Sequence, residues 1–354
     1  MKILVRPPNW VGDAVMAIPA LEALRGARAD DEICVLARPA VAELFSEQAF
    51  ADRILPYGFH GSHQGWLGRE KLVAGLRKGN FQVAVLLQNA FEAAWLAWRA
   101  GIPERIGYSR DARGPLLTKA IEVPRLGEIS KHESHYYLEL LHRAGWIEGI
   151  PPIPTTRLLV SDRARTAAEI ALQGAGARGN AWRCAIAPGA SYGAAKCWPP
   201  ERFALLADRL ISDCGADVIF FGTPGEKEIA ARIRSNMKSR AISLVGETSM
   251  CDLVALFASC SAFIGNDSGA MHVAAAAGLP VIGIFGSTDP EGTSPVTEQF
   301  TLIREPVSCS PCFLRRCPVD HRCMMRITVD SVFTAAMRLK NAGKNLFVGG
   351  AGNG

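Results

Sequence analysis

Short apolar runs alternate with helical patterns along the whole chain. The runs are rich in β-branched and other apolar residues and are typical of buried strands: residues 3–5, 33–36, 83–87, 184–187, 218–221, 262–264 and 281–285. Alternation of strands with helices indicates parallel sheets that are covered by helices. The pattern therefore predicts an α/β protein that is built on doubly wound parallel sheets.

The chain is long enough to form two domains. It has 354 residues, of which 49% are hydrophobic, and single cores rarely grow beyond about 250 to 300 residues. Residues 149–154 read GIPPIP, and the three prolines favour an extended connection over a helix. We therefore expect one sheet domain in residues 1–150 and another in residues 151–327. Ligands of such sheets bind outside the carboxyl ends of the strands, so we expect the active site in the cleft between the domains.

A last helical pattern follows the second domain. Thr328 can cap this helix, apolar residues recur on one face from Val329 to Met337, and Gly343 is placed to end it. The pattern predicts a helix over residues 328–342 and a flexible tail over residues 343–354.

Composition and charge limit the classes of partner. The net charge of +5 is spread along the chain without a dense run of Lys and Arg, so a nucleic acid is not expected as a partner. Anionic small molecules and an anionic membrane surface remain as candidates. The apolar run at residues 3–5 is too short for a signal peptide, and the longest one, residues 270–286, is interrupted by His272 and by residues 278–280. We therefore expect a cytoplasmic protein whose ten cysteines are mostly reduced.

The first stretch with chemical potential is RPPNWVGDAVMAIPALEALR, residues 6–25. It follows the first predicted strand, and Asp13 stands where the helix is expected to open. Asp is a preferred N-cap residue. The same carboxylate, at the carboxyl end of a strand, can also act as a general base. Both interpretations stay open on the residues alone.

The second stretch is AFIGNDSGAMHVAAAAGLPVIGIFGSTDP, residues 262–290. A strand ends before Asp267, and Ser268 and Gly269 open an Ala-rich helix with His272 in its first turn. Bare backbone N–H groups and the helix dipole make such a turn a phosphate site. Alternatively, Asp267 caps the helix and His272 packs in the core.

The third stretch is APGASYGAAKCWPPERF, residues 187–203. It also follows a strand, and its Gly-containing loop carries Ser191, Tyr192 and Lys196. A Lys ammonium close to a phosphate oxygen is worth about 4 kcal/mol before desolvation. Lys196 is therefore a candidate to stabilise a leaving diphosphate, although an ordinary surface lysine fits the same pattern.

One glycine motif has the wrong context. Residues 174–179 match GxGxxG, but they follow a helical pattern and precede a strand. A dinucleotide fingerprint follows a strand and opens a helix. We therefore interpret residues 174–179 as a plain loop.

A cysteine-rich segment, residues 309–323, lies near the C-terminus. The spacing of its first two cysteines is that of half a zinc site, whereas the remaining cysteines and the histidine do not complete a common pattern. A structural zinc is one interpretation, and a reduced or partly disulfide-bonded surface loop is the other. The candidate ligands are Cys309, Cys312, Cys317, His321 and Cys323.

The ordered set of motifs resembles the bacterial ADP-heptose:lipopolysaccharide heptosyltransferases, most closely their type II members. The resemblance runs from residue 1 to about residue 340, and its sharpest motif is NDSGAMHVAAA. The other segments that carry it are NWVGDAVMAIPAL, PGASYGAAKCWP, FFGTPGE, VGETSMCDLVALFA and CSPCFLRRCPVDHRCM. It implies a GT-B fold, in which two Rossmann-like domains face each other across a cleft and a last helix crosses back to the N-terminal domain.

The resemblance also implies roles for single residues. Asp13 matches the catalytic base of the family, and Lys196 matches the lysine at the donor diphosphate. The remaining positions that match the donor site are Ser191, Tyr192, Glu226, Thr248, Asp267, Ser268, Gly269 and His272. Tyr192 is bulkier than the small hydroxyl residues of some members. For the anionic acceptor, the basic residues of RIGYSRDARGPLLTK are candidates, namely Arg105, Arg110, Arg113 and Lys119.

The implied reaction is an inverting transfer of L-glycero-D-manno-heptose from ADP-heptose to the heptosyl-Kdo-lipid A inner core of lipopolysaccharide. No cofactor is expected for catalysis. The acceptor is a lipid, so peripheral contact with the inner leaflet of the inner membrane is expected. The alternatives are a type I enzyme that acts on Kdo-lipid A, and a metal-binding or redox-sensing protein that uses the cluster from Cys309 to Cys323.

Overall fold

The computed structural model describes residues 1–58, 61, 63–152 and 156–348, and the chain forms two compact units, Met1–Thr156 and Arg157–Gly354. The expected division after residue 150 falls in the same connection. Residues 153 and 154 of the proline-rich stretch lie outside the described residues, as do residues 349–354 of the expected tail.

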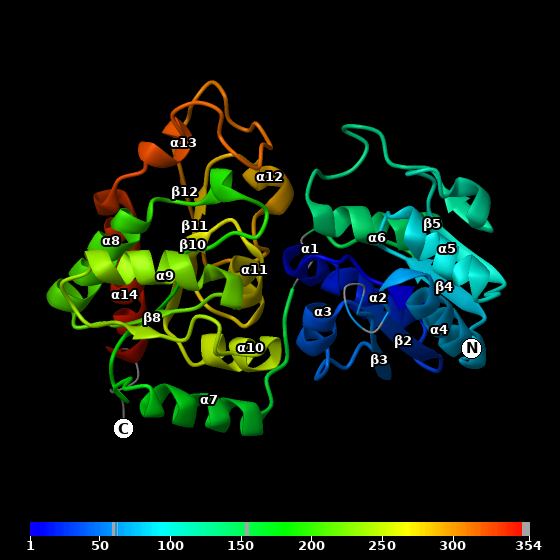
Figure 1. The fold of residues 1–354 in the computed structure, drawn as a ribbon, viewed down its shortest axis with the longest axis horizontal. Coiled ribbons are helices and arrows are strands. Elements are labelled where there is room, and N and C mark those ends of the chain that lie inside the picture. The colour runs from blue at the N-terminus through cyan, green and yellow to red at the C-terminus, as the bar shows by residue number, and fades with distance from the viewer. Residues whose placement is uncertain (59–60, 62, 153–155, 349–354) are drawn as a thin grey trace. The chain divides into compact units, whose positions relative to one another are not determined.

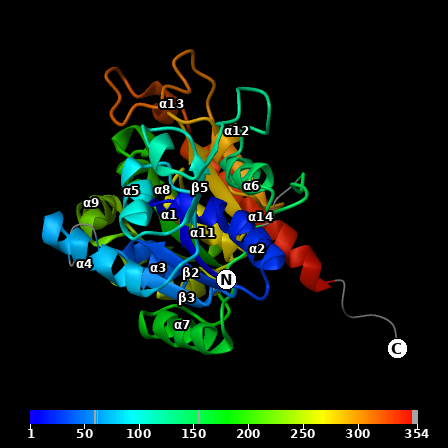
Figure 2. The same cartoon turned by 90° about the vertical axis from the view of Figure 1, so that its right-hand side faces the viewer.

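The first unit holds a six-stranded parallel sheet in the order β3-β2-β1-β4-β5-β6. Its strands are β1 (Lys2–Arg6), β2 (Glu32–Ala37), β3 (Arg53–Pro56), β4 (Val83–Leu86), β5 (Glu104–Tyr108) and β6 (Lys119–Ile121). Its helices are α1 (Val11–Met16), α2 (Ile18–Ala27), α3 (Pro39–Leu44), α4 (Gly65–Lys78), α5 (Phe91–Arg99) and α6 (Glu133–Arg143), with a 3-10 turn at Gly114–Leu116. Helices α4 and α5 lie side by side (Figures 1 and 2).

The second unit repeats this order with strands β12-β11-β10-β7-β8-β9, all parallel. The strands are β7 (Arg183–Ala187), β8 (Asp217–Phe220), β9 (Ile242–Ser243), β10 (Ala262–Asn266), β11 (Val281–Phe285) and β12 (Phe300–Arg304). The α-helices are α7 (Asp162–Gly174), α8 (Pro200–Cys214), α9 (Lys227–Asn236), α10 (Met250–Ala258), α11 (Gly269–Ala276), α12 (Pro290–Thr293), α13 (Arg322–Met325) and α14 (Val329–Val348). Two 3-10 turns, Ala194–Lys196 and Pro224–Glu226, complete the unit.

The predicted fold class is confirmed, since every strand predicted from an apolar run is present and each unit has the strand order of a Rossmann-like domain. The strands that the pattern missed are β3, β5, β6, β9 and β12, which lie at or next to the sheet edges. Edge strands are half exposed and carry polar residues, so they lack a continuous apolar run. The loop interpretation of residues 174–179 is also confirmed, because they follow α7 and precede β7.

The C-terminal helix differs from its prediction in length. Thr328 accepts a hydrogen bond from the backbone N–H of Ser331 at 3.1 Å, as a cap should. However, α14 continues past Gly343 to Val348. A glycine inside a helix costs only about 1 kcal/mol, so it does not force an end.

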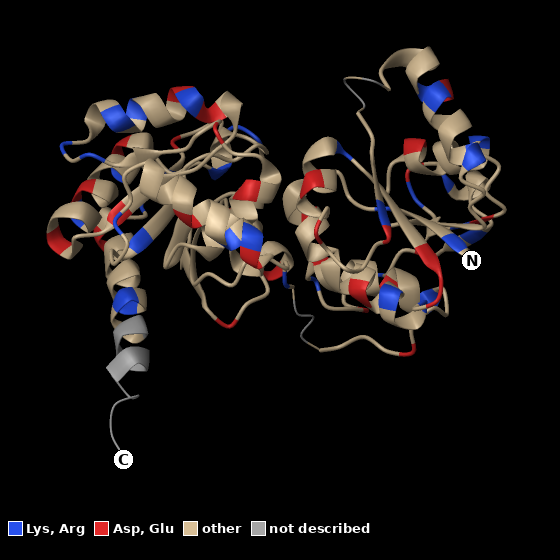
Figure 3. Cartoon of the chain, turned by 90° about the horizontal axis from the view of Figure 1, so that it is seen from below, with Lys and Arg blue, Asp and Glu red and all other residues tan. Residues whose placement is uncertain are grey.

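Helix α14 belongs to the second unit, where it lies beside α8 (Figure 1). Buried Val332 and Ala336 join the core that α8 and the β-sheet form. The crossing of this helix to the N-terminal domain stays a prediction. Along the ribbons of both units, Lys and Arg alternate with Asp and Glu (Figure 3).

Candidate active site

Each sheet has one point at which the strand order reverses, between β1 and β4 in the first unit and between β7 and β10 in the second. The connections that follow such neighbouring strands leave on opposite faces of the sheet and open a crevice at their carboxyl ends. Asp13 follows β1, Lys196 follows β7, and Asp267 follows β10. The predicted catalytic and donor residues thus lie at the two places where a doubly wound sheet binds ligands.

Asn266 joins the two loops at the carboxyl ends of β7 and β10. Its fully buried side chain donates a hydrogen bond to the carbonyl of Pro188 at 2.6 Å and accepts one from the backbone N–H of Trp198 at 3.0 Å. The two hydrogen bonds satisfy the buried amide of Asn266 as well as its two backbone partners. Asn266 therefore fixes both ends of the loop that carries Lys196, residues 188–197, which we name the lysine loop.

The ammonium of Lys196 lies against the carboxylate of Asp267. The Lys196 Nζ to Asp267 Oδ2 distance is 2.5 Å, and the side chains are 12% and 4% exposed. The hydroxyl of Thr288, which follows β11, donates to the same carboxylate oxygen at 2.6 Å. Two predicted residues that are 71 positions apart thus form one buried, charge-neutral pair.

The N-terminus of α11 carries an unpaired hydroxyl. Ser268 is the N-cap residue, yet its side chain makes no capping bond, and within the described residues its buried Oγ has no hydrogen-bond partner. The Oγ of Ser287, which follows β11 and is 1% exposed, is also without a partner in this part of the chain. Free hydroxyls beside the bare N–H groups of a helix start suit the oxygens of a phosphate.

The other donor candidates differ in burial and in their contacts with the lysine loop. The side chain of Glu226 packs closely against Gly189 of the lysine loop. A Cβ at Gly189 would lie 1.6 Å from the Glu226 Oε1. Only glycine allows this approach. Ser191 is exposed, Thr248 is half buried between β9 and α10, and His272 is buried at 4% exposure in α11.

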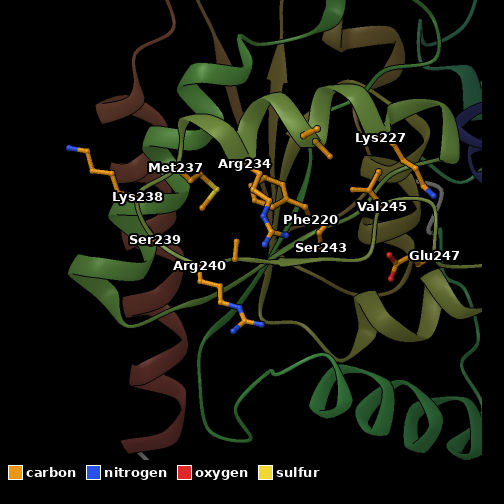
Figure 4. A pocket seen from close by; sticks show the side chains of 13 residues that line it. Phe220, Lys227, Arg234, Met237, Lys238, Ser239, Arg240, Ser243, Val245 and Glu247 are labelled. Atoms are coloured by element: carbon orange, nitrogen blue, oxygen red, sulfur yellow. The ribbon is translucent and has the colours of Figure 1, made fainter.

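A pocket of about 630 Å³ opens beside this edge, between α9 and residues 237–247 (Figure 4). Its floor is apolar, and its rim carries Lys227, Arg234, Lys238, Arg240 and Glu247. Lys227 and Glu247 are the chain neighbours of the candidates Glu226 and Thr248, which do not line the pocket themselves. Lys196, Asp267 and Ser268 lie at the turns after β7 and β10, and none of them lines this pocket.

The candidate metal ligands of residues 309–323 differ in burial and in their contacts. Among the residues that the structure describes, no group of three or more His, Cys, Asp or Glu side chains is placed to hold a metal ion. The ring of His321 contacts the carbonyl of Ala195 through Nε2 at 2.9 Å, and Cys323 is buried while Cys309 is exposed. Burial, followed by the charges of Cys309, Cys317 and Cys312, raises the pKa of Cys323, so these thiols lie near one another. A structural zinc at this segment stays a prediction.

In the first unit, the loop before α1 is held by a buried arginine. Arg6, at the end of β1, is 2% exposed and donates to the carbonyl of Leu36 at 3.0 Å and to the Asn9 Oδ1 at 2.8 Å. Burial lowers the pKa of the Arg6 guanidinium to about 10. Arg6 thereby fixes the start of the segment that leads to Asp13.

Asp13 does not cap its helix. Helix α1 begins at Val11 with Trp10 as its N-cap, so Asp13 is the third helical residue and lies in the first turn. The N-cap interpretation is therefore wrong, although the helix dipole still favours a carboxylate at this position. The chain also breaks at Ala17 into two helices, because Pro19 starts the second of them.

Two side chains of α6 respond to the charge of Asp13. Burial, followed by the charge of the Asp13 carboxylate, raises the pKa of Glu133 to about 7, although Arg110 opposes both effects. Burial, followed by the charge of Asp13, also raises the pKa of the fully buried Tyr137. Asp13 and Glu133 thus form a pair of interacting carboxylates at the starts of α1 and α6, which pack together.

Three of the four basic acceptor candidates are occupied inside the first unit. Arg113 is fully buried and donates to the carbonyl of Tyr108 at 2.8 Å and to the Asn89 Oδ1 at 3.0 Å. Arg105 donates to the carbonyl of Leu116 at 2.6 Å, and the ammonium of Lys119 donates to the carbonyl of Ala144 at 2.5 Å. These side chains hold loops together. Arg113 is fully buried and thus unavailable to an acceptor, whereas the assignment of Arg105 and Lys119 stays a prediction.

Arg110 is the exception. Its side chain is 47% exposed, it lies 3.5 Å from the Asp111 carboxylate, and its charge acts on Glu133. A hydrogen bond with Tyr136 raises the pKa of Arg110. Arg110 is therefore the basic candidate that lies beside the two carboxylates.

The geometry can be compared with known proteins. The model of glycosyltransferase family 9 (heptosyltransferase) matches residues 69–322. The chain is 31% identical over 316 residues to lipopolysaccharide heptosyltransferase 2 of Escherichia coli K12, which covers 86% of this chain and 88% of that protein. The chain belongs to glycosyltransferase family 9, the heptosyltransferases.

Further relatives agree with this membership. Lipooligosaccharide heptosyltransferase 2 of Haemophilus ducreyi is 30% identical over 324 residues, which cover 86% of this chain and 88% of that protein. The solved structure of ADP-heptose lipopolysaccharide heptosyltransferase II from E. coli superimposes with a TM-score of 0.82 at 27% identity, covering 97% of this chain and 100% of that one. The resemblance and the GT-B fold inferred from the sequence are confirmed. Among the described helices of this heptosyltransferase, none is long and apolar enough to cross a membrane.

Sequence reasoning missed several groups at the site of this heptosyltransferase. Asn266 ends β10 and Arg6 ends β1, so their position at a carboxyl edge was a usable signal. Glu133 gave no such signal, because its role depends on burial and on Asp13 in another element.

Proposed function

We propose that this heptosyltransferase transfers L-glycero-D-manno-heptose from ADP-heptose to the heptosyl-Kdo-lipid A inner core, with inversion at the anomeric carbon. The observation that carries the proposal is the turn at the end of β10, where the Lys196–Asp267 pair and the unpaired Ser268 hydroxyl lie at a helix N-terminus. The type II acceptor is supported by the names of the relatives that are at least 30% identical over most of the chain.

In the proposed reaction, Asp13 takes the proton of the attacking acceptor hydroxyl. Inversion needs a base on the side opposite the leaving group, and general-base help is typically worth about 10²- to 10⁴-fold. Its neighbour Glu133 keeps its proton to a higher pH than an ordinary glutamate, since burial and the Asp13 charge raise the pKa of Glu133 to about 7. In this arrangement the negative charge, and with it the basicity, resides on Asp13.

The leaving ADP is stabilised in the second unit. Lys196 and the N-terminus of α11 at Ser268 and Gly269 supply positive potential where the diphosphate charge develops, and His272 lies in the first turn of the same helix. Ser191, Tyr192, Glu226 and Thr248 complete the proposed donor site. We assign no divalent cation to this step, because the protein's own cations and helix dipole supply the stabilisation.

Arg110 is the proposed contact for the anionic groups of the acceptor, since it is the exposed cation beside Asp13 and Glu133. We further propose that the enzyme works at the cytoplasmic face of the inner membrane. Large apolar side chains are exposed on the first unit at the starts of α1 and α4, where Trp10 is 53%, Trp66 is 63% and Leu67 is 85% exposed. Such residues suit the interface of a bilayer that holds a lipid acceptor.

Product analysis by mass spectrometry tests the transfer. Purified enzyme receives ADP-heptose and either an acceptor that ends in Kdo or one that ends in the first heptose. The proposal predicts one added heptose on the heptose-ended acceptor. Transfer to the Kdo-ended acceptor alone would make the enzyme type I, and transfer to neither would contradict the proposed reaction.

Sedimentation with vesicles of anionic phospholipid tests the membrane contact. The double substitution Trp66→Ser and Leu67→Ser is expected to lower the fraction of protein bound to vesicles several-fold. Burial of apolar surface in the bilayer contributes about 25 cal/mol of binding free energy for each Å², and the variant has less such surface to bury. Leu205→Ser on α8 is the control, since Leu205 is also exposed, at 52%. Equal binding of both variants would contradict the assignment of this surface.

A further inference from the structure

The cysteine segment, residues 309–323, packs on the lysine loop through backbone groups. The backbone N–H of Ala195 donates to the carbonyl of Arg315 at 3.1 Å, and the Tyr192 hydroxyl donates to the carbonyl of Phe313 at 2.7 Å. On the other side of the segment, the N–H of Phe313 donates to the carbonyl of Ser287 at 2.8 Å. The segment therefore bridges the loops that follow β7 and β11.

Gly193 makes this close approach feasible. Its φ is 156°, and a Cβ at this position would meet the carbonyl oxygen of Arg315 at 2.3 Å. A larger residue at this position would push the lysine loop and the cysteine segment apart. The position of Arg315 relative to the lysine loop is thus set by backbone contacts and does not depend on the Arg315 side chain.

Tyr192 connects the two cations of this region. The Lys196 Nζ lies 5.0 Å from the centroid of the Tyr192 ring, and the guanidinium carbon of Arg315 lies 5.4 Å from the same centroid. Cation–π contacts at such distances hold a flexible cation at a ring. Tyr192, which is bulkier than the residue at this position in some family members, therefore makes cation–π contacts with both Arg315 and Lys196.

The charged groups described so far leave room for a further cation at this edge. Lys196 is neutralised by Asp267, so the pair has no net charge. In the part of the chain that the structure describes, Arg315 forms no ion pair, and its side chain is exposed. A diphosphate carries at least two negative charges, and a planar guanidinium binds such oxygens with two parallel hydrogen bonds.

We propose that Arg315 binds the diphosphate of the nucleotide-sugar donor. The Tyr192 ring holds its guanidinium by a cation–π contact, and the backbone contacts of the cysteine segment hold its position. This inference rests on the proposed function, because it takes ADP-heptose as the donor. It gives the cysteine segment a place in the donor site without a metal ion.

Calorimetry with the full-length protein tests the proposal, with ADP and adenosine as probes. Arg315→Gln is expected to raise the Kd of ADP about tenfold or more, because charge-assisted hydrogen bonds to the phosphates are lost. The Kd of adenosine, which has no phosphate, should change less than about twofold, and Arg315→Lys should restore part of the ADP affinity. The matched control is Arg316→Gln, which removes the same charge from the next residue of the exposed segment.

Each outcome separates the alternatives. Equal ADP affinity of the Arg315→Gln and Arg316→Gln variants would overturn the proposal while leaving the proposed function intact. Equal losses for ADP and adenosine would also overturn it, because Arg315 would then only support the loop. A wild-type protein that binds no ADP would instead contradict the proposed function itself. The Gln variant keeps the backbone contacts, and an unchanged Tm verifies this.

Discussion

The carboxyl edges of the two sheets have the same topology but are built differently. At the edge of the second unit, the key groups are buried and bonded to one another: Asn266 joins two loops, and Lys196 is paired with Asp267. At the edge of the first unit, the carboxylates of Asp13 and Glu133 interact, and the neighbouring Arg110 is about half exposed. The difference suits a preorganised site for the nucleotide-sugar donor in the second unit and a more open surface for the large acceptor in the first.

The largest effect is expected from breaking the buried ion pair. Lys196→Met leaves the Asp267 carboxylate at 3% exposure with the Thr288 hydroxyl. Loss of one partner of a buried pair costs about 3 to 5 kcal/mol of unfolding free energy. The loss of a cation about 4 Å from a phosphate lowers kcat/KM for ADP-heptose about a thousandfold. Denaturation and steady-state kinetics measure the two effects.

The double variant Lys196→Met with Asp267→Asn is the control for this prediction. It removes both charges, so it should regain most of the stability but none of the activity. A single Lys196→Met variant that is as stable as the wild type would show that the pair is not a buried, coupled unit.

A second prediction contrasts two arginines of the first unit. Arg113→Gln leaves the carbonyls of Tyr108 and Gln88 and the amide of Asn89 without a buried donor. It should lower the unfolding free energy by about 2 to 4 kcal/mol, since each unsatisfied buried group costs about 1 to 3 kcal/mol. Urea denaturation measures this loss.

Arg110→Gln should behave in the opposite way. The exposed side chain contributes about 0 to 1 kcal/mol to stability, but its loss should raise the acceptor KM about tenfold. An Arg110→Gln variant with an unchanged acceptor KM would remove Arg110 from the proposed acceptor site.

A third prediction concerns pH. The pKa of Glu133 is raised to about 7 in the folded protein, so the folded state binds more protons than the unfolded chain between about pH 4.5 and 7. The contribution of Glu133 to stability is therefore present at low pH and is lost as the pH rises through 7. Glu133→Gln removes this loss, so the variant should gain up to about 3 kcal/mol relative to the wild type between about pH 5 and 8.

Activity profiles give a second readout for Glu133. In the wild type, kcat/KM against pH should show an inflection near 7, because ionisation of Glu133 changes the basicity of Asp13. The Glu133→Gln profile should lack this inflection. An identical profile in both proteins would mean that the two carboxylates do not titrate as a pair during catalysis.

The smallest expected effect is that of a chelator. The account assigns stabilisation of the leaving diphosphate to Lys196, Arg315 and the helix dipole, so excess EDTA should change the transfer rate by less than about twofold. Loss of activity in EDTA and its return with Mg²⁺ would require an acidic metal site that the account does not contain.

The same comparison explains what the sequence could predict. The turn at Asp267, Ser268 and Gly269 is a local strand-to-helix pattern, so its place at a carboxyl edge followed from neighbouring residues. The pairing of Lys196 with Asp267 spans 71 positions and needed the sheet order.

The errors have a physical cause as well. Arg105 and Arg113 donate to the carbonyls of Leu116 and Tyr108 in their own segment, and Lys119 donates to the carbonyl of Ala144 in another, so the fold of the backbone decides where these cations point. A lone arginine in a sequence does not reveal whether it is buried. The N-cap was placed three positions too late, at Asp13, because Trp10 lacks the side chain of a usual cap residue and gave no signal.

In the proposed reaction, the second unit binds the donor while Asp13 of the first unit performs the base step. Heptose transfer and ADP binding of the wild type are therefore compared with those of Asp13→Asn. We expect a kcat that is about a hundredfold or more lower, with a Kd for ADP within about twofold of the wild type. Full transfer activity in a folded Asp13→Asn protein would contradict the account and leave Asp13 as an ordinary acidic residue in the first turn of its helix.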